Sequence, residues 1–242
     1  MINMDDQELS NILFVDIETA TGSPTYKELD DRLKHHWDRK AGFLNNPQEL
    51  STDELYFERA GIFAEFGQVV TIAVGYMIRT EGSWGLRIKA FAYKDEVRIL
   101  NEFKELLVSK FDPETLQLCA HNGREFDFPY ICRRMLIHGI SIPRILDTGN
   151  MKPWEIPIID TMNMWKFGDR KNYTSLDLLA ALFNIETSKS DIDGSDITRV
   201  YHQEDGLERI SEYCKRDIVV TVQLFLKLKS LPLVNPENIT IL

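Results

Sequence analysis

The sequence predicts an α/β fold in which a mixed sheet carries helices on both faces. Its predicted elements run strand, two antiparallel strands, helix, strand and helix, which is the order expected of such a sheet. At 242 residues, with 43% hydrophobic and 27% charged residues, the chain has the size and composition of a globular domain. We therefore expect a single domain over residues 1–242, with its sites at the carboxyl ends of strands.

The first strand is predicted at Ile12–Val15, an apolar run that is followed by Asp16 and Glu18. Because side chains alternate between faces along a strand, these two carboxylates point the same way. Carboxylate oxygens are the ligands that Mg²⁺ and Mn²⁺ prefer. Such a pair also arises by chance after hydrophobic runs, so alone it does not identify a metal site.

A helical insert is predicted after the first strand, over about residues 22–65. Leu29, Leu33 and Trp37 recur every four positions, and Ser51–Glu54 is a capping box that opens a second helix. The charges of the insert are mixed in sign. This favours a solvated helical pair covering one edge of the sheet over a functional role.

The middle of the chain alternates strands and helices. β-Branched and aromatic residues dominate two strands joined by the turn Thr80–Ser83, and later segments show helical spacing of apolar residues. The predicted elements are strands Gly67–Ile78 and Leu86–Tyr93, helix Asp95–Lys110, strand Leu116–Ala120 and helix Phe126–His138.

The last third of the chain is predicted to be mainly helical. It opens on a short strand that ends in Asp160 and closes on a long amphipathic helix. Between them come a helix capped by Thr174 or Ser175, the polar loop Ser188–Gly194, and then the long helix Gly206–Leu228.

Charge and composition exclude several classes of protein. A net charge of −10 argues against a protein that grips long duplex through a broad basic surface, although a local basic patch and bound metal ions would still allow nucleic acid. The cysteines Cys119, Cys132 and Cys214 have no paired spacing, which predicts buried thiols rather than disulfides or zinc ligands. The acidic opening and the short longest apolar run predict a cytoplasmic protein without membrane contact.

Two further segments carry candidate chemistry. Asp127 falls in the first turn of a helix, beside the mouth of the sheet, where an acid can also simply complement the helix dipole. Tyr213 and Asp217 are four residues apart and share one helical face. An aspartate within a buried helix is costly unless a partner compensates its charge, and a metal ion would do so.

Together, three motifs resemble those of the DEDD superfamily of exonucleases, which has the ribonuclease H-like fold. They are Asp-x-Glu on the first strand, Asn-x-x-x-Phe-Asp at a strand-to-helix turn, and Tyr-x-x-x-Asp on a late helix. Relatives of another subclass carry a histidine at the position of Glu212, so Tyr213 indicates the tyrosine subclass. The chain is most similar to the exonuclease domain of family-B DNA polymerases, in its stand-alone predicted relatives. Phe66–Ile72 and Ser175–Leu179 extend the resemblance over about Asn11–Leu228.

The resemblance implies a 3′–5′ exonuclease that releases nucleoside monophosphates from single-stranded 3′ ends with two Mg²⁺ or Mn²⁺ ions. Asp16 would bridge the two ions, Glu18 and Asp217 would complete the first, and Asp127 would support the second. Tyr213 would orient the attacking water, since an ordinary pKa of about 10 makes it a poor general base at neutral pH.

Substrate contacts are expected next to these residues. Asn122 would touch the sugar or phosphate, and Phe126 and Phe128 could stack on a base, although a residue at the position of Phe128 is more often part of the core. A basic segment after Asp160 is either a phosphate patch or a solvated turn, and its members are Lys166, Arg170 and Lys171.

Two alternatives to a DNA exonuclease remain open from the sequence. One is a catalytically silent ribonuclease H-like module that binds nucleic acid or protein, although all four acids and the tyrosine are present. The other is an exoribonuclease that trims RNA 3′ ends, because the metal site is indifferent to the sugar. No sequence remains for a polymerase palm, fingers or thumb, so a proofreading role is not expected to follow from the resemblance.

Overall fold

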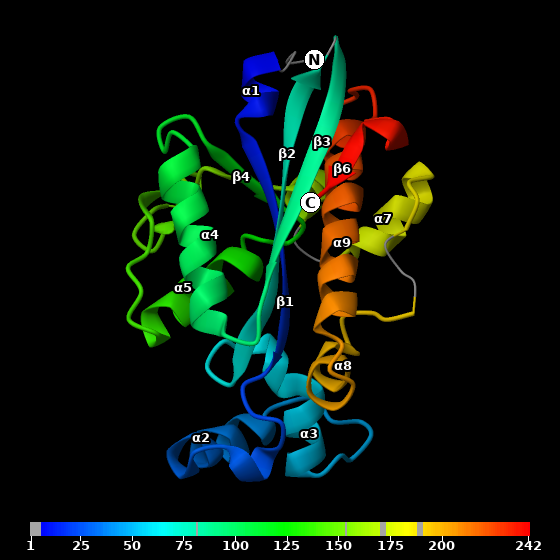
Figure 1. Cartoon of the computed structure of the whole chain (residues 1–242). Coiled ribbons are helices and arrows are strands. Elements are labelled where there is room, and N and C mark those ends of the chain that lie inside the picture. Colours follow the sequence, from blue (N-terminus) through cyan, green and yellow to red (C-terminus); the bar gives the residue numbers. More distant parts are fainter. Residues whose placement is uncertain (1–5, 81, 153, 170–172, 188–190) are drawn as a thin grey trace.

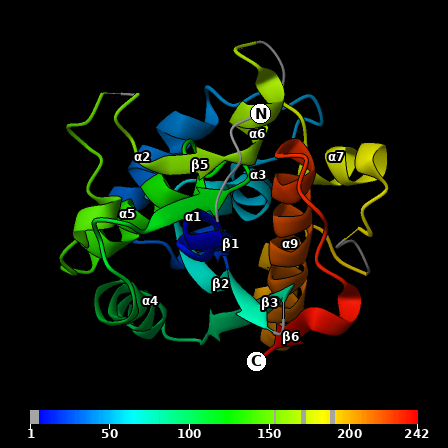
Figure 2. The same cartoon turned by 90° about the horizontal axis from the view of Figure 1, so that it is seen from above.

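A computed structural model of the chain describes residues 6–80, 82–152, 154–169, 173–187 and 191–242. The described residues form a six-stranded sheet of order β5-β4-β1-β2-β3-β6 with helices on both faces (Figure 1). Viewed from above, α4 and α5 lie on one side of this sheet and α9 on the other (Figure 2). The predicted mixed α/β class is therefore confirmed.

The sheet has an antiparallel centre and parallel flanks. β1 pairs antiparallel with β2 and β2 with β3, whereas β4 is parallel to β1, β5 to β4, and β6 to β3. The strands are β1 Ile12–Thr21, β2 Gly67–Thr80, β3 Ser83–Ala92, β4 Gln117–Ala120, β5 Ile158–Asp160 and β6 Ile239–Ile241.

Most of the predicted helices are present within one or two residues. The helices are α1 Asp6–Ser10, α2 Asp31–Ala41, α3 Thr52–Arg59, α4 Glu96–Lys110, α5 Asp127–Ile137, α6 Thr161–Lys166, α7 Leu176–Phe183, α8 Ile197–Gln203 and α9 Leu207–Leu228. Short 3-10 turns include η2 at Ala60–Ile62. The sequence did not predict α1, α6, α8 or β6. Of these, β6 is only three residues long and depends on pairing with β3.

Alternation along β1 divides the core into two layers. Leu13, Val15 and Ile17 pack on the side of α4 and α5. Ile12 and Phe14 pack on the side of α9. Residues two apart share a face, so the even-numbered Asp16 and Glu18 point to the α9 side.

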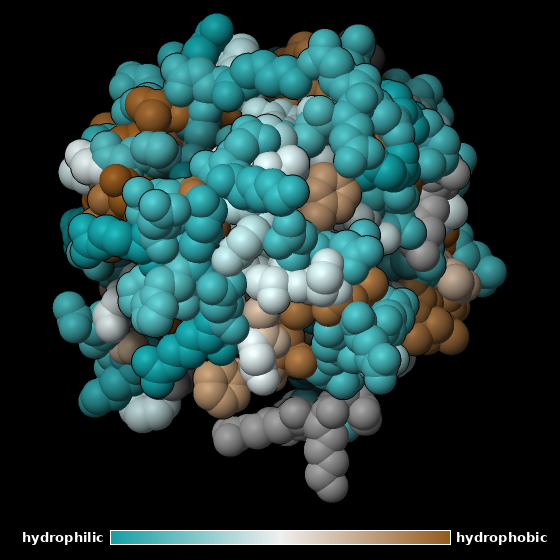
Figure 3. Space-filling model, turned by 90° about the horizontal axis from the view of Figure 1, so that it is seen from below, coloured by the Kyte–Doolittle hydropathy of each residue, from teal (hydrophilic) through white to brown (hydrophobic). Residues whose placement is uncertain are grey.

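The insert lies at the end of the central strands, below the sheet in Figure 1, and not along a sheet edge as predicted. The reason is topological: the chain leaves β1 at Thr21 and re-enters at Gly67 in β2, and these two strands are neighbours in the middle of the sheet. The insert has a small core of its own around Trp37 and Tyr56. Its outer surface, seen from below, is largely hydrophilic (Figure 3).

The predicted capping box of α3 is present. Glu54 N–H donates to Ser51 Oγ, and the Ser51 backbone N–H donates to Glu54 Oε2 at 2.8 Å. We expect Ser51→Ala to lower the free energy of unfolding by about 1 kcal/mol, because an N-terminal amide of the helix loses its acceptor. Urea denaturation measures this change. Thr52→Ala, which removes an exposed hydroxyl outside the capping box, is the control, and an equal loss in both variants would contradict the prediction.

None of the helices in the described part of the chain is both long enough and apolar enough to cross a membrane.

Candidate active site

β1 presents its two acids to α9. Asp16 lies opposite Ala73 and Glu18 opposite Thr71 on β2, and the register shifts between Glu18 and Thr19. Such bulges bend a strand and re-aim its side chains. Glu18 is 8% exposed, so its carboxylate lies inside the protein beside the helix.

α9 brings three polar side chains to these acids. The Cys214 thiol donates to Asp16 Oδ2 at 3.1 Å. One turn further on, Asp217 is hydrogen-bonded by the Tyr213 hydroxyl. The ligand atoms of Asp16, Glu18 and Cys214 all lie within 4.8 Å of one another. Because Tyr213 and Asp217 share one face of α9, both lie near the acids of the first strand.

Asp127 comes from the opposite layer and reaches β1 where β4 has ended. β4 stops at Ala120, and the chain turns into α5, whose first residue is Asp127. Its Oδ1 accepts the Ile17 backbone N–H at 3.2 Å. The fourth acid is thus fixed to the backbone of the strand that carries the first two.

The four carboxylates repel one another. Burial, followed by the negative charges of Asp217, Glu18 and Asp127, raises the pKa of Asp16 well above its ordinary value. The pKa of Glu18 is raised by burial and then by Asp217 and Asp127. Burial is also the main cause that raises the pKa of Asp127, to about 7, against two hydrogen bonds that lower it. A bound cation would reverse this balance, because it favours the ionised forms.

The donor set fits a hard divalent cation. Carboxylate oxygens predominate, as Mg²⁺ and Mn²⁺ require, and the thiol of Cys214 is the exception among the side chains of the site. Because the pKa of Cys214 is raised well above its ordinary value, first by burial and then by Asp16, the protonated thiol acts here as a hydrogen-bond donor to Asp16.

Asp160 holds the turn that carries Asn122. Its carboxylate accepts the backbone N–H groups of Asn122 at 3.1 Å and Arg124 at 3.2 Å, and it also caps α6. Asn122 has φ 64°, a left-handed conformation that asparagine tolerates better than most residues. Its Oδ1 is buried and, within the described residues, has no hydrogen-bond partner. This leaves an acceptor at the site.

His121 is fixed in its neutral form. Its Nε2 donates to the Thr174 carbonyl at 2.9 Å, so Nδ1 accepts from the Thr161 hydroxyl at 2.9 Å. Burial is the main cause that lowers the pKa of His121. The ring therefore supports the turn and carries no positive charge at neutral pH.

Asp16, Glu18 and Asp127 border a cleft of about 640 Å³, whereas Asp217 and Tyr213 of α9 are not among its lining residues. Its walls come from β1, the Asn122 turn, the end of the insert and the segment before α8. Among the lining residues are Asp16, Glu18, Arg59, Ile62, Asn122, Phe126, Asp127, Tyr173 and Ser195.

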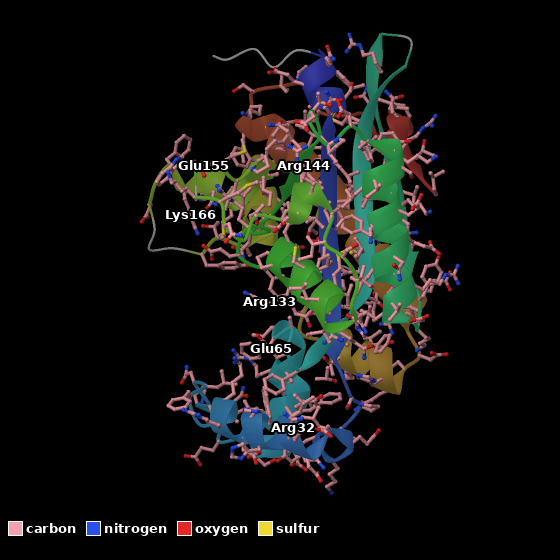
Figure 4. The ribbon with its side chains drawn as sticks, turned by 90° about the vertical axis from the view of Figure 1, so that its left-hand side faces the viewer. Arg32, Glu65, Arg133, Arg144, Glu155 and Lys166 are labelled. Atoms are coloured by element: carbon pink, nitrogen blue, oxygen red, sulfur yellow. The ribbon has the colours of Figure 1, made fainter. Side chains whose placement is uncertain are left out.

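Two of the predicted substrate-binding residues do not line the cleft. Phe128 is 2% exposed and packs in the core, with its ring against the backbone of Gly123, so it cannot stack on a base. Lys166 lines a separate cavity with Arg124 and Asp169, and Figure 4 shows it on the segment near Glu155, away from the insert.

Several predicted features fall in part or wholly outside the described residues. They are Arg170 and Lys171 of the basic segment, Glu81 of the turn between β2 and β3, and Ser188–Ser190 of the polar loop.

The sequence did not single out Arg59, Ile62 or Tyr173 as residues of the cleft, nor Cys214 as the hydrogen-bond partner of Asp16. Only Cys214 left a signal, since it is next to Tyr213 on the same helix. Tyr173 is 70% exposed and, with Phe126, offers an aromatic ring at the cleft.

Comparison with known proteins identifies two similarities. The model of a family described as predicted 3′–5′ exonucleases related to the exonuclease domain of PolB matches residues 63–233, which leaves Asp16, Glu18 and nearly all of the insert outside the match. The structure is similar to a family-B DNA polymerase from the archaeon Pyrobaculum calidifontis, with a TM-score of 0.58 and 19% identity over 90% of this chain and 24% of that chain. This likeness shows the fold, which is that of the ribonuclease H-like exonuclease domain. A search of curated proteins gave no match.

Proposed function

Because the chain belongs to the family of predicted 3′–5′ exonucleases related to the exonuclease domain of PolB, we propose that it hydrolyses single-stranded 3′ ends, with DNA preferred to RNA. The observation that carries this proposal is the convergence of Asp16, Glu18, Asp127 and Asp217 from two helices and one strand. The preference for DNA comes from the polymerase relatives and is part of the proposal.

We propose that these four acids hold Mg²⁺ or Mn²⁺ and that Asp16 is the central ligand. Its support is electrostatic: the charges of the three other acids all act on Asp16. When bound, the metal would activate the attacking water and stabilise charge on the leaving oxygen. Water adds to the phosphorus, the bond from phosphorus to the 3′ oxygen breaks, and the products are a nucleoside 5′-monophosphate and a new 3′-hydroxyl.

The other residues of the cleft would position the terminal nucleotide. The unpaired Oδ1 of Asn122 can accept a hydrogen bond from a sugar hydroxyl. The rings of Phe126 and Tyr173 can stack on the base, which single-stranded nucleic acid allows and a paired end does not.

Tyr213 is proposed to orient the attacking water. Burial, followed by the charges of Asp217, Glu18 and Asp16, raises its pKa above the ordinary value of about 10, so the hydroxyl stays protonated at neutral pH. A protonated phenol can donate or accept a hydrogen bond but cannot remove a proton.

We expect Tyr213→Phe to lower the rate by about tenfold, since one positioning hydrogen bond is lost while the acids remain. Degradation of a 5′-labelled oligonucleotide measures the rate. The slope of the pH profile between pH 7 and 9 should be unchanged, because a positioning hydroxyl does not titrate there. A variant as inactive as one lacking Asp16 would contradict this role.

The proposed activity is tested with matched 5′-labelled DNA and RNA oligonucleotides in Mg²⁺, Mn²⁺ or chelator. We expect stepwise shortening from the 3′ end that depends on metal and is faster on DNA than on RNA. Faster shortening of RNA would change the substrate class to the exoribonuclease. No shortening of either would favour the catalytically silent module.

A further inference from the structure

The end of the insert forms one wall of the cleft that Asp16, Glu18 and Asp127 line. Arg59, the last residue of α3, and Ile62, in the turn that follows, both line it. We propose that this wall binds the substrate strand behind its terminal nucleotide, with Arg59 on a phosphate and Ile62 against a base or sugar. The proposal rests on the proposed exonuclease function and extends it to substrate recognition.

Charge points to Arg59 as a phosphate ligand. The described residues that line the cleft include four carboxylates, those of Asp16, Glu18, Glu58 and Asp127, but Arg59 is the one lysine or arginine among them. Metal ions would compensate charge at the reacting phosphate, whereas the next phosphates of the strand need cations from the protein. Arginine suits this contact, because its planar guanidinium binds phosphate oxygens in pairs.

Arg59 is also available for a ligand. Arg59 is exposed, and its guanidinium takes part in none of the ion pairs and hydrogen bonds found among the described residues. Arginines elsewhere in the described chain, such as Arg134 and Arg209, are held by carboxylates. A guanidinium that borders the cleft without a protein partner can bind substrate without first breaking an ion pair.

The wall is held rigidly to the helix that carries Asp127. From α5, the Tyr130 hydroxyl donates to the Gly61 carbonyl at 2.8 Å, and Arg134 Nη1 donates to the Ala64 carbonyl at 2.9 Å. Gly61 packs so closely on β1 that an added Cβ would lie 3.1 Å from the Ala20 carbonyl carbon. The segment from Arg59 to Ala64 is thus tied to α5, which carries Asp127, and to β1, which carries Asp16 and Glu18.

A buried ion pair reinforces this attachment. Glu96 accepts from Arg134 Nε at 2.9 Å and from Nη2 at 2.6 Å, and it also accepts the Val69 backbone N–H at 2.7 Å. Arg134 therefore links the wall, α4 and the start of β2. A substrate wall needs such support, because a site that moves relative to the acids loses alignment of the reacting phosphate.

Ile62 gives the wall an apolar part. It borders the cleft and is 47% exposed. The face of an unpaired base or a deoxyribose would cover this surface. Arg59 and Ile62 both precede the region of the family match, which begins at residue 63, so this wall belongs to the part of the chain that the family model does not describe.

The test compares Arg59→Ala, Arg59→Lys and the control Arg32→Ala. Arg32 lies on α2 of the same insert, where Figure 4 shows it at the end remote from Lys166, and it is not among the residues that line the cleft. We expect Arg59→Ala to raise the KM for a DNA single strand of about ten nucleotides by about tenfold, with kcat changed less than about threefold. Arg59→Lys should recover part of the loss, and Arg32→Ala should match the wild type.

Two readouts identify a phosphate contact. The slope of log KM against log salt should fall by about 0.7 in Arg59→Ala, as for one lost contact to a single strand. The nitrophenyl ester of thymidine 5′-monophosphate has no upstream phosphate, so Arg59→Ala should hydrolyse it at the wild-type rate. A lower rate on this ester, or an unchanged KM and salt slope on DNA, would overturn the proposal.

Binding separates this proposal from the proposed function. Anisotropy of a labelled single strand in Ca²⁺ measures affinity without requiring hydrolysis, and melting curves verify that each variant is folded. If the wild type binds the strand and Arg59→Ala binds about tenfold more weakly, the wall is supported even where no hydrolysis is seen. Equal binding by folded wild type and Arg59→Ala would refute the proposal that this wall binds substrate. The proposed exonuclease activity would then still stand.

Discussion

Asp16→Asn is expected to lower the rate of 3′-end removal by at least about 10³-fold, or roughly 4 kcal/mol of barrier, while the fold stays intact. Asparagine keeps the shape of the side chain and an oxygen that can accept from the Cys214 thiol, so packing at β1 is preserved. It removes the negative charge on which all three other acids act. The affected step is therefore metal binding and not folding.

Release of mononucleotides from a 5′-labelled strand, at matched metal and enzyme concentrations, measures this loss. Asp31→Asn is the matched control: the same exchange is made on the insert, where the Asp31 side chain is 95% exposed. That variant should keep the wild-type rate. If Asp16→Asn retained more than about a tenth of the activity, Asp16 would not be the central ligand.

The sequence predicted the acids of the candidate site because each follows a local rule. Alternation along a strand pairs Asp16 with Glu18, and helical spacing pairs Tyr213 with Asp217. Both rules concern neighbours in the chain. That the two pairs form one site was inferred from the family resemblance and not from these rules. The structure shows on which side of the sheet each side chain lies.

Contacts between distant segments explain the errors. Phe126 and Phe128 both lie at the start of α5, but only Phe126 borders the cleft, because Phe128 packs in the core with residues of β1, β2 and α4. Similarly, the mixed charges of the insert led to the prediction of a solvated pair of helices. Its position at the end of β1 and β2, which brings Arg59 to the acids, is set by tertiary packing that no local pattern encodes.

Short elements were missed for a related reason. β6 has three residues and no alternation that could be recognised, and it is a strand because Leu86–Ile88 of β3 offers a free edge. α8 follows a polar segment and is held by tertiary contacts, in which His202 Nε2 donates to the Thr21 carbonyl at 2.9 Å and Val200 is fully buried.

The second large effect is on stability and needs no substrate. Mn²⁺ or Mg²⁺ should raise the free energy of unfolding by about 2.7 kcal/mol when the free ion is a hundredfold above its dissociation constant, because the ion binds the assembled acids far better than the unfolded chain. The rise should be largest near pH 7.5. At that pH fewer protons compete with the ion for the carboxylates than at pH 5, where their raised pKa values favour the protonated forms.

The direction of the pH dependence follows from the raised pKa values. For Asp127, the pKa is about 7 in the folded protein, against 3.8 ordinarily, so between these values the folded protein binds more protons than the unfolded chain. Stability in chelator should therefore fall as pH rises from about 4 to about 7. Bound metal should largely remove this fall, because it holds the acids in their ionised forms.

Melting curves in chelator and in a Mn²⁺ series, at fixed ionic strength and at about pH 5 and 7.5, measure both effects. Asp217→Ala should be stabilised less by Mn²⁺, since α9 then offers one ligand fewer. In chelator it should also lose less stability with rising pH, because one repelling charge is gone. Asp31→Ala, which changes an exposed carboxylate of the insert, should behave as the wild type does. A midpoint unmoved by saturating metal, or an equal rise in Asp217→Ala, would mean that these acids do not form a metal site, and the catalytically silent module would then account better for the fold.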